Sequence, residues 1–172
     1  MGTLESSMSA PERSRTVNWS DPMIVVNAAK TQSGLDRLRA IMAGNVPGAP
    51  MALLVGIKPV LVERGRVVFE GKVEEYHYNL GGVGHGGLAC TMLDSALGCA
   101  VTSMLPAGRS CATTDLHVRF VRPITIASGT LRCEANIVHL GKTIGTAEAR
   151  LTDGAGKLCA HATTACAILQ ED

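Results

Sequence analysis

Hydrophobic residues recur with two different periods along the chain, and the difference predicts its secondary structure. From Ile57 to Glu74 apolar and charged residues alternate, with Glu63–Gly65 as a turn, which predicts a hairpin of two strands. Between Gly86 and Leu105 apolar residues instead fall at positions 88, 89, 92, 93, 96, 97, 100, 101 and 104. That spacing has the period of a helix, so we expect one long helix here.

Four runs with strand character follow the long helix and are separated by short turns. They cover Cys111–Val121, Thr130–His139, Thr143–Thr152 and Lys157–Leu169. Strands joined by such short turns are mostly antiparallel, because parallel strands need long crossover connections. The sequence therefore predicts an α+β fold in which an antiparallel sheet of five to six strands wraps around one long central helix. A single helix cannot cover a wide sheet and also bury its own outer face, so we expect a second subunit to cover part of it.

The beginning of the chain lacks these periods. Residues 1–32 mix Ser, Pro, Glu and Arg, which predicts a flexible leader. A helical pattern runs from Gly34 to Ala43, and the glycines and prolines between Gly44 and Pro50 then interrupt it. We expect a leader over residues 1–32 and a single domain over residues 33–172, which is an ordinary domain length.

Composition and charge argue against several classes of partner. The chain has 16 Lys and Arg against 15 Asp and Glu, and only 3% of its residues are aromatic, so nucleic acid is not an expected partner. A carboxylate at the centre of the long helix disfavours a membrane span. The six cysteines form no Cys-x-x-Cys pair, and no secretory signal is visible, which predicts a cytoplasmic protein.

Asp94 is the single charged side chain between Gly86 and Leu105. A carboxylate in an apolar helix is costly unless partners or a function justify it. Its neighbours on the same face of the helical wheel are all small: Gly87, Cys90, Thr91 and Gly98. Another molecule could therefore approach the carboxylate closely. The structural alternative is that Asp94 pairs with a core arginine or caps a neighbouring element.

The loop before this helix is rich in glycine. Gly82, Gly84 and Gly87 fit the G-x-G-x-x-G spacing of dinucleotide sites, but the strands that follow lack the second crossover helix of such a fold. What the glycines provide is accessible backbone N–H groups at a helix N-terminus, where developing negative charge is favoured. That describes an oxyanion hole as readily as a phosphate site. His85 is a candidate for this chemistry, or it caps a turn.

We expect no metal site and no serine nucleophile. The other histidines, His77, His117, His139 and His161, form no H-E-x-x-H motif or close ligand pair. The sequence also contains no G-x-S-x-G nucleophile elbow.

Asn79, the His85-Gly86-Gly87 triplet six positions later and Asp94 together resemble the phenylacetate-type (PaaI-like) hotdog-fold thioesterases. The run Phe120–Pro123 and the turn at Gly141 and Lys142 add to a resemblance that covers about residues 38–169. It implies an enzyme that hydrolyses an acyl-coenzyme A thioester to the free acid and coenzyme A. No bound cofactor is implied, because coenzyme A is part of the substrate.

The resemblance also implies a role for individual residues. Asp94 would be the general base or nucleophile, the Gly86 amide would polarise the thioester carbonyl, and His85 and Asn79 would set the loop. Thr113 matches a position whose hydroxyl orients water, and is otherwise an ordinary strand threonine.

Coenzyme A itself would meet Gly87, Lys142 and Arg122. Lys142 matches a basic turn that meets the phosphates, and is otherwise an exposed turn lysine. Arg119 and Arg122 are weaker candidates of the same kind.

Two other functions stay open at this point. A hotdog enoyl-coenzyme A hydratase or dehydratase would use a histidine and a carboxylate, which His85 and Asp94 could supply. A non-catalytic acyl-coenzyme A binding module would follow if Asp94 were structural.

Helix geometry predicts that the site is shared between two chains. Gly86 and Asp94 are eight residues apart, which is roughly 12 Å along one helix axis. A single thioester carbonyl cannot touch both groups. We therefore expect a homodimer with antiparallel helices and two shared active sites, and an association of two such dimers into a homotetramer.

Overall fold

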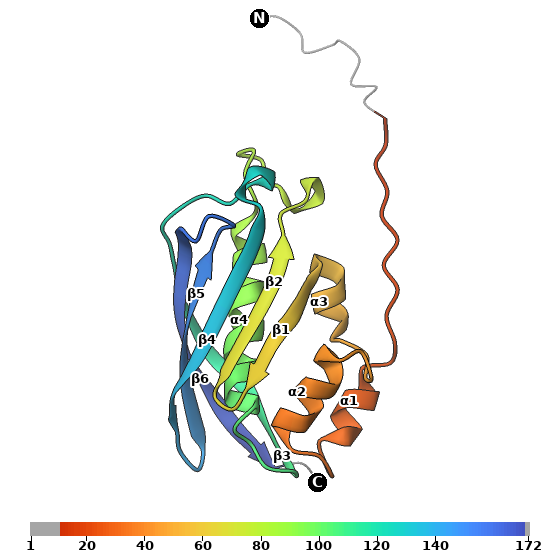
Figure 1. Cartoon of the computed structure of the whole chain (residues 1–172), viewed down its shortest axis with the longest axis vertical. Coiled ribbons are helices and arrows are strands. Elements are labelled where there is room, and N and C mark those ends of the chain that lie inside the picture. The colour runs from red at the N-terminus through yellow and green to blue at the C-terminus, as the bar shows by residue number, and fades with distance from the viewer. Residues whose placement is uncertain (1–10, 171–172) are drawn as a thin grey trace, which may run out of the picture.

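The computed structural model describes residues 11–170 of the chain, and within them six antiparallel strands form one sheet (Figure 1). The strand order is β1-β2-β4-β5-β6-β3. Their bounds are β1 (Ile57–Glu63), β2 (Arg66–Lys72), β3 (Arg109–Phe120), β4 (Thr130–Leu140), β5 (Ile144–Thr152) and β6 (Leu158–Gln170). The sheet includes the predicted hairpin of β1 and β2 and the four predicted strands after the long helix.

The long helix α4 (Gly86–Thr102) packs along the sheet and contacts five of its strands, β2 to β6. Its buried residues follow the predicted helical period: Leu88, Ala89, Met92, Leu93, Ala96, Leu97, Ala100 and Val101. The helix ends before the predicted Leu105, because Pro106 disfavours a helical conformation at the residue before it. The last turn is tight, with the Met104 N–H donating to the Val101 carbonyl at 3.0 Å. The predicted fold, a hotdog sheet around one long central helix, is confirmed.

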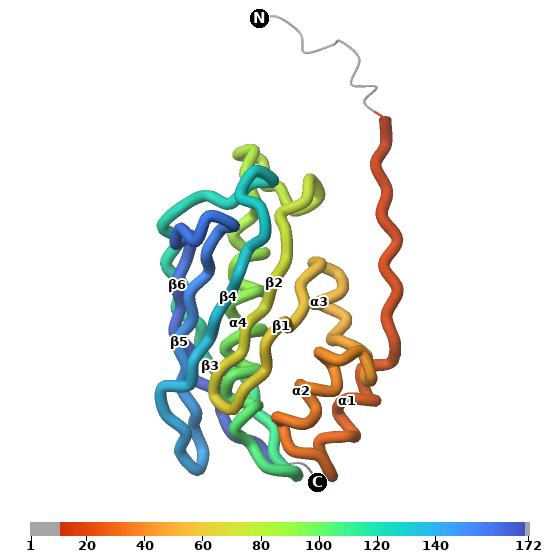
Figure 2. Tube along the Cα trace, viewed as in Figure 1, coloured from red at the N-terminus to blue at the C-terminus, as the bar shows by residue number. Residues whose placement is uncertain are grey.

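Three short helices precede the sheet: α1 (Met23–Ala28), α2 (Gly34–Met42) and α3 (Pro50–Val55). Figure 2 shows α2 and α3 beside β1, the first edge strand of the sheet. The two 3-10 turns, η1 (Glu75–His77) and η2 (Ile126–Ser128), lie in loops. α2 corresponds to the helical pattern expected from Gly34 to Ala43.

Two of these helices were not predicted. α1 lies inside the segment expected to be a leader, of which residues 1–10 are outside the described residues. Ala29, just after α1, is buried, and its carbonyl accepts a hydrogen bond of 2.8 Å from the Gly108 N–H. α3 begins at Pro50, which was interpreted as a helix breaker. Proline is well suited to the first position of a helix, where no N–H partner is needed.

The strand β3 forms the other edge of the sheet and pairs with β6, with Thr113 opposite Cys166. It is 12 residues long and mostly exposed. Within residues 11–170 no strand pairs with its outer edge. Long edge strands with free backbone groups readily pair with another chain, so β3 is a natural place for a subunit contact.

The close contact between α2 and α4 gives a prediction about stability. A Cβ atom added to Gly34 would lie 1.8 Å from the Thr102 carbonyl oxygen, which is backbone and cannot move away cheaply. We expect Gly34→Ala to lower Tm by roughly 5–10 °C, because overpacking of this kind costs about 2–3 kcal/mol. The matched control is Gly48→Ala, where the new Cβ would meet only Leu53 Cδ2 at 4.0 Å. Thermal unfolding followed by circular dichroism measures both, and equal Tm values would contradict the prediction.

Candidate active site

Asp94 lies on the outer face of α4, opposite the residues that pack on the sheet, and is half-buried. Its Oδ1 accepts a hydrogen bond of 2.9 Å from Thr113 Oγ1 on β3. No ion pair formed within residues 11–170 involves Asp94. Within the described residues Asp94 therefore has no arginine partner, which was the structural alternative. Its second carboxylate oxygen stays available.

Asp94 and Thr113 line the larger of two cavities near α4, with a volume of about 940 Å³. Its other walls come from α2, α3, the loop between them, β1 and the extended segment around Trp19. Gly98, one turn after Asp94, lies on the same wall. Of the small residues predicted to share the face of Asp94, only Gly98 lines this cavity, because the cavity extends from Asp94 towards the C-terminal end of α4 and Gly87, Cys90 and Thr91 lie on the N-terminal side. The cavity is large enough for an organic ligand.

The pKa values of two cysteine thiols beside this cavity shift in opposite directions. Burial and the nearby Asp94 carboxylate raise the pKa of Cys99 to about 12, so this thiol stays protonated. A hydrogen bond from Cys166 lowers the pKa of Cys111, which also lines the cavity. Neither cysteine was singled out from the sequence, because their surroundings depend on the packing of β3 and β6 against α4.

His85 caps the N-terminus of α4. Its ring Nδ1 accepts a hydrogen bond of 2.8 Å from the Gly87 N–H, and its backbone N–H donates to the His77 carbonyl at 2.7 Å. The ring therefore caps the helix, which is one of the two roles that the sequence allowed. Its Nδ1 is the hydrogen-bond acceptor of the Gly87 N–H. Within residues 11–170 the Gly86 N–H donates to no protein acceptor, as expected at the first position of a helix.

Asn79 holds the loop before α4 in shape. Its Oδ1 accepts hydrogen bonds from the N–H groups of Gly81 at 2.8 Å and Val83 at 3.4 Å, and its own N–H donates to the Val83 carbonyl at 2.8 Å. Gly84 lies against Ile124, whose carbonyl accepts its N–H at 2.8 Å. A Cβ at Gly84 would meet Ile124 Cγ1 at 2.9 Å, so the loop can lie this close only because the residue is glycine.

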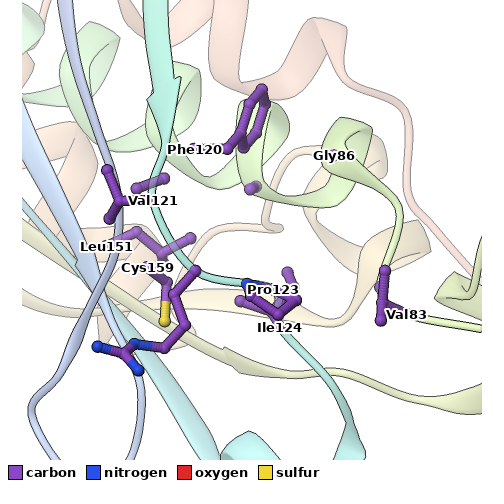
Figure 3. A pocket seen from close by; sticks show the side chains of 12 residues that line it. Val83, Gly86, Phe120, Val121, Pro123, Ile124, Leu151 and Cys159 are labelled. Carbon is purple, nitrogen blue, oxygen red and sulfur yellow. The ribbon is translucent and has the colours of Figure 1, made fainter.

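A second cavity of about 370 Å³ lies beside the first turn of α4 (Figure 3). Gly86, Phe120 and Arg122 are among its lining residues. The ring of Phe120 covers Gly86, where an added Cβ would lie 3.3 Å from Phe120 Cζ. The Arg122 Nε donates to the Leu158 carbonyl at 3.4 Å. Arg122 thus lies beside the N-terminus of α4, and its contact with coenzyme A stays a prediction.

Lys142 lies elsewhere. It is exposed in the turn between β4 and β5, near the C-terminal half of α4. A Cβ at Gly145 beside this turn would lie 2.8 Å from Val101 Cγ1. The turn is thus at the opposite end of α4 from Arg122 and Gly86, and one chain does not bring Lys142 and Arg122 together.

The candidate residues therefore form two groups on one chain. One group is Asp94 at the middle of α4 with Thr113 beside it on β3, and the other is Asn79, His85 and Gly86 at the N-terminus of α4. The cavity that Asp94 lines does not include Gly86, and the cavity that Gly86 lines does not include Asp94. The separation of roughly 12 Å expected from the helical rise agrees with this arrangement.

Other kinds of site have no counterpart in the described part of the chain. No group of three or more His, Cys, Asp or Glu side chains there could hold a metal ion. None of the helices over residues 11–170 is long and apolar enough to cross a membrane.

Comparisons with known proteins agree with this architecture. Residues 81–160 match the model of the family described as the Thioesterase superfamily. Acyl-coenzyme A thioesterase 13 of Homo sapiens is 32% identical over 98 residues, which are 56% of this chain and 69% of that protein. A protein of Halobacterium salinarum with an esterase designation is 40% identical over 87 residues, which are 49% of this chain and only 55% of that relative. A phenylacetic acid degradation-related protein of Ralstonia eutropha has a solved structure with a TM-score of 0.69 and 28% identity, and covers 76% of this chain and 98% of its own.

This chain belongs to the thioesterase superfamily. The predicted resemblance to the phenylacetate-type hotdog thioesterases is confirmed, and the assignment supports thioester hydrolase activity. The matched region, residues 81–160, contains the end of the loop that precedes α4, all of α4, and the strands β3 to β5. The segments that complete the larger cavity, around Trp19 and between α2 and α3, lie outside it.

Proposed function

We propose that the protein is an acyl-coenzyme A thioesterase that hydrolyses its substrate to a free acid and coenzyme A. The observation that carries the proposal is the position of Asp94. Its carboxylate is half-buried on α4, is held by the Thr113 hydroxyl at 2.9 Å, and borders a cavity of about 940 Å³. A carboxylate placed in this way is suited to activate water or to attack a thioester.

The reaction needs stabilisation of negative charge on the carbonyl oxygen. The Gly86 N–H at the N-terminus of α4 can provide it, because the helix dipole favours negative charge there and no protein acceptor within residues 11–170 occupies this N–H. As a general base, Asp94 takes a proton from water while the water oxygen bonds to the carbonyl carbon; the C–S bond then breaks, and the leaving thiolate takes that proton from Asp94. As a nucleophile, an Asp94 oxygen bonds to the carbonyl carbon and the C–S bond breaks, which leaves an acyl-Asp94 anhydride. Water then hydrolyses the anhydride to the free acid and the Asp94 carboxylate, and its second proton goes to the thiolate. His85 and Asn79 act indirectly, since their hydrogen bonds fix the position of the loop and of this amide.

We propose further that Gly86 and Asp94 of one active site come from two chains. They are about 12 Å apart on the same helix, and donors and attacking group must each lie near 3 Å from the reacting atoms. The free edge of β3 supports a dimer, because Thr113 lies on this strand beside Asp94. A partner that joins along β3 with α4 antiparallel would bring its own helix N-terminus towards Asp94. A dimer of such dimers is the assembly that we propose.

This arrangement also gives Lys142 a place in the proposal. With antiparallel helices, the C-terminal end of one α4 lies near the N-terminal end of the other. Lys142 would then approach the partner's helix N-terminus, where Arg122 is proposed to meet coenzyme A. The Gly87 backbone, expected to meet coenzyme A as well, already has protein partners in His85 Nδ1 and Thr91 Oγ1. Lys142 of one chain and Arg122 of the other would then contact the phosphates of the same coenzyme A, although the two residues are far apart within one chain.

The six cysteines support a reducing location such as the cytoplasm. All six, Cys90, Cys99, Cys111, Cys133, Cys159 and Cys166, are free thiols.

Incubation with a small panel of acyl-coenzyme A substrates tests the proposed reaction. Release of free thiol supports a thioesterase, whereas formation of a hydrated acyl-coenzyme A would indicate a hydratase. Binding without any turnover would indicate a non-catalytic module, and either of these two results would contradict the proposal.

Thr113 gives a milder prediction. Thr113→Val removes the hydroxyl that donates to Asp94 and keeps the shape, so we expect kcat to fall about tenfold. KM should change little, because Thr113 acts on the carboxylate rather than on the acyl group. Thr114→Val is the matched control, since the hydroxyl of Thr114 donates to the Ala165 carbonyl and not to Asp94. Steady-state kinetics on both variants checks this, and equal kcat values would contradict the assigned role.

A further inference from the structure

We propose that the larger cavity holds the acyl group, and that its shape selects medium- and long-chain acyl groups over acetyl. The proposal rests on the proposed thioesterase function and names the substrate class for the same site. Three features define this acyl cavity beyond Asp94: Trp19, Gly98 and the loop Gly44–Ala49.

The cavity begins at the proposed reacting group and leads away from it. Asp94 and Thr113 line one part. Leu53, Ile57 and Phe69 line the part beside α2 and α3. An acyl carbonyl placed at Asp94 would therefore extend its chain between α4 and the helices α2 and α3. The lining is largely apolar, and its charged residues are Asp94 and Lys58, which suits a hydrocarbon chain and not a polar one.

The size of the cavity points to a long acyl group. Its volume of about 940 Å³ is close to the upper end of the ~300–1,000 Å³ usual for small-molecule sites. An acetyl group would leave most of this space unused. Each further methylene that enters an apolar site adds favourable transfer free energy, equivalent to about fourfold in binding or in kcat/KM.

Gly98 keeps the wall of the acyl cavity open next to Asp94. It lies in the interior of α4, where glycine is unfavourable relative to alanine. A Cβ added at this position would meet no atom of the described chain within 4 Å, so close packing there does not require a glycine. What the missing side chain does provide is space in the cavity, one helical turn beyond the carboxylate.

Trp19, which is 64% exposed, lines the cavity from a segment that the superfamily match does not include. The Arg15 guanidinium ties this segment to α3, since it donates to the carbonyl oxygens of Leu54 at 2.6 Å and Leu53 at 3.2 Å. It also stacks over the Tyr76 ring at 4.2 Å. A wall held in this way can limit or support the far end of an acyl chain.

The test measures kcat/KM for acetyl-, butanoyl-, octanoyl- and palmitoyl-coenzyme A. For the wild type we expect at least ~100-fold higher kcat/KM with octanoyl- than with acetyl-coenzyme A. Gly98→Leu should narrow the cavity next to Asp94 and lower the octanoyl-to-butanoyl ratio at least ~10-fold. Trp19→Ala should lower the palmitoyl-to-butanoyl ratio about fivefold. Ile24→Ala is the matched control, because Ile24 is an exposed residue of α1 that does not line the cavity, and it should leave both ratios unchanged.

The outcomes separate this inference from the proposed function. If acetyl-coenzyme A is hydrolysed as efficiently as octanoyl-coenzyme A, or if Gly98→Leu and Trp19→Ala leave both ratios unchanged, the selectivity proposal is overturned while the thioesterase stands. If no acyl-coenzyme A is hydrolysed, the proposed function fails, and equilibrium binding then tests the cavity by itself. Tighter binding of octanoyl- than acetyl-coenzyme A would support the inference, and equal affinity would overturn it.

Discussion

Replacing Asp94 with asparagine should lower kcat by at least ~10²-fold while the protein stays folded. Asparagine keeps the shape of the side chain and can still accept the Thr113 hydrogen bond through its amide oxygen. It cannot take up a proton as a general base, and it is a poor nucleophile. The loss should therefore fall on kcat, with little change in Tm or in the affinity for substrate.

The control for Asp94→Asn is the same chemical change at Asp115, two positions after Thr113 on β3. Asp115 Oδ1 accepts a hydrogen bond of 3.2 Å from the Ala165 N–H, which an asparagine oxygen can also accept. Asp115→Asn should keep near wild-type turnover. If Asp94→Asn also retains near wild-type kcat, Asp94 is structural and the mechanism is wrong.

Removing the Gly86 amide should have an effect of similar size. Gly86→Pro replaces the N–H at the first position of α4, where proline is tolerated. His85 already has ψ 136°, which is the conformation preferred before proline. With one oxyanion donor lost, we expect kcat to fall by about 10²–10³-fold without loss of the fold.

Gly86→Ala is the matched control for the amide. It adds a Cβ 3.3 Å from Phe120 Cζ, as proline also does, but keeps the N–H. Phe120 is exposed, so its ring can shift by the small distance needed. Gly86→Ala should therefore retain most of the activity. Equal losses in the alanine and proline variants would indicate that crowding against Phe120, and not the amide, is what matters.

Much of the fold could be predicted because its elements are long and strongly patterned. α4 repeats its apolar residues over more than four turns, and a helix of that length leaves a periodic signal that no other element reproduces. The strands were predicted for a related reason, since short turns such as Asp153–Gly156 separate them. The predicted ends of elements were less accurate. The long helix ends at Thr102 and not at the predicted Leu105, because Pro106 disfavours a helical conformation at the residue before it.

The short helices and the cavity could not be predicted in this way. α1 and α3 have six residues each, fewer than two turns, so no period is visible in their sequences. The acyl cavity joins Trp19 to Gly98, which are far apart in the chain and come together only through the packing of α2 and α3 beside β1. The sequence identified Asp94 because a lone charge in an apolar helix is conspicuous, whereas an apolar wall residue such as Phe69 resembles any core residue.

The role of His85 shows the same limit at a single residue. The sequence placed it in a glycine-rich loop at the start of a helix, which fits either catalysis or capping. The hydrogen bond of 2.8 Å from the Gly87 N–H assigns its Nδ1 to the cap. The loop geometry that decides this comes from two backbone hydrogen bonds, one from the His85 N–H to the His77 carbonyl and one from the Gly84 N–H to the Ile124 carbonyl, which is far away in the sequence.

The most direct test of the central claim, a site shared between two chains, is complementation between two inactive variants. Gly86→Pro and Asp94→Asn are each expected to be nearly inactive alone. When equal amounts are refolded together, random pairing makes about half of the dimers mixed, and each mixed dimer holds one intact site of two. We expect roughly a quarter of wild-type thiol release to return. If well-folded and demonstrably mixed dimers stay inactive, Gly86 and Asp94 do not act across the dimer and the shared-site architecture is contradicted.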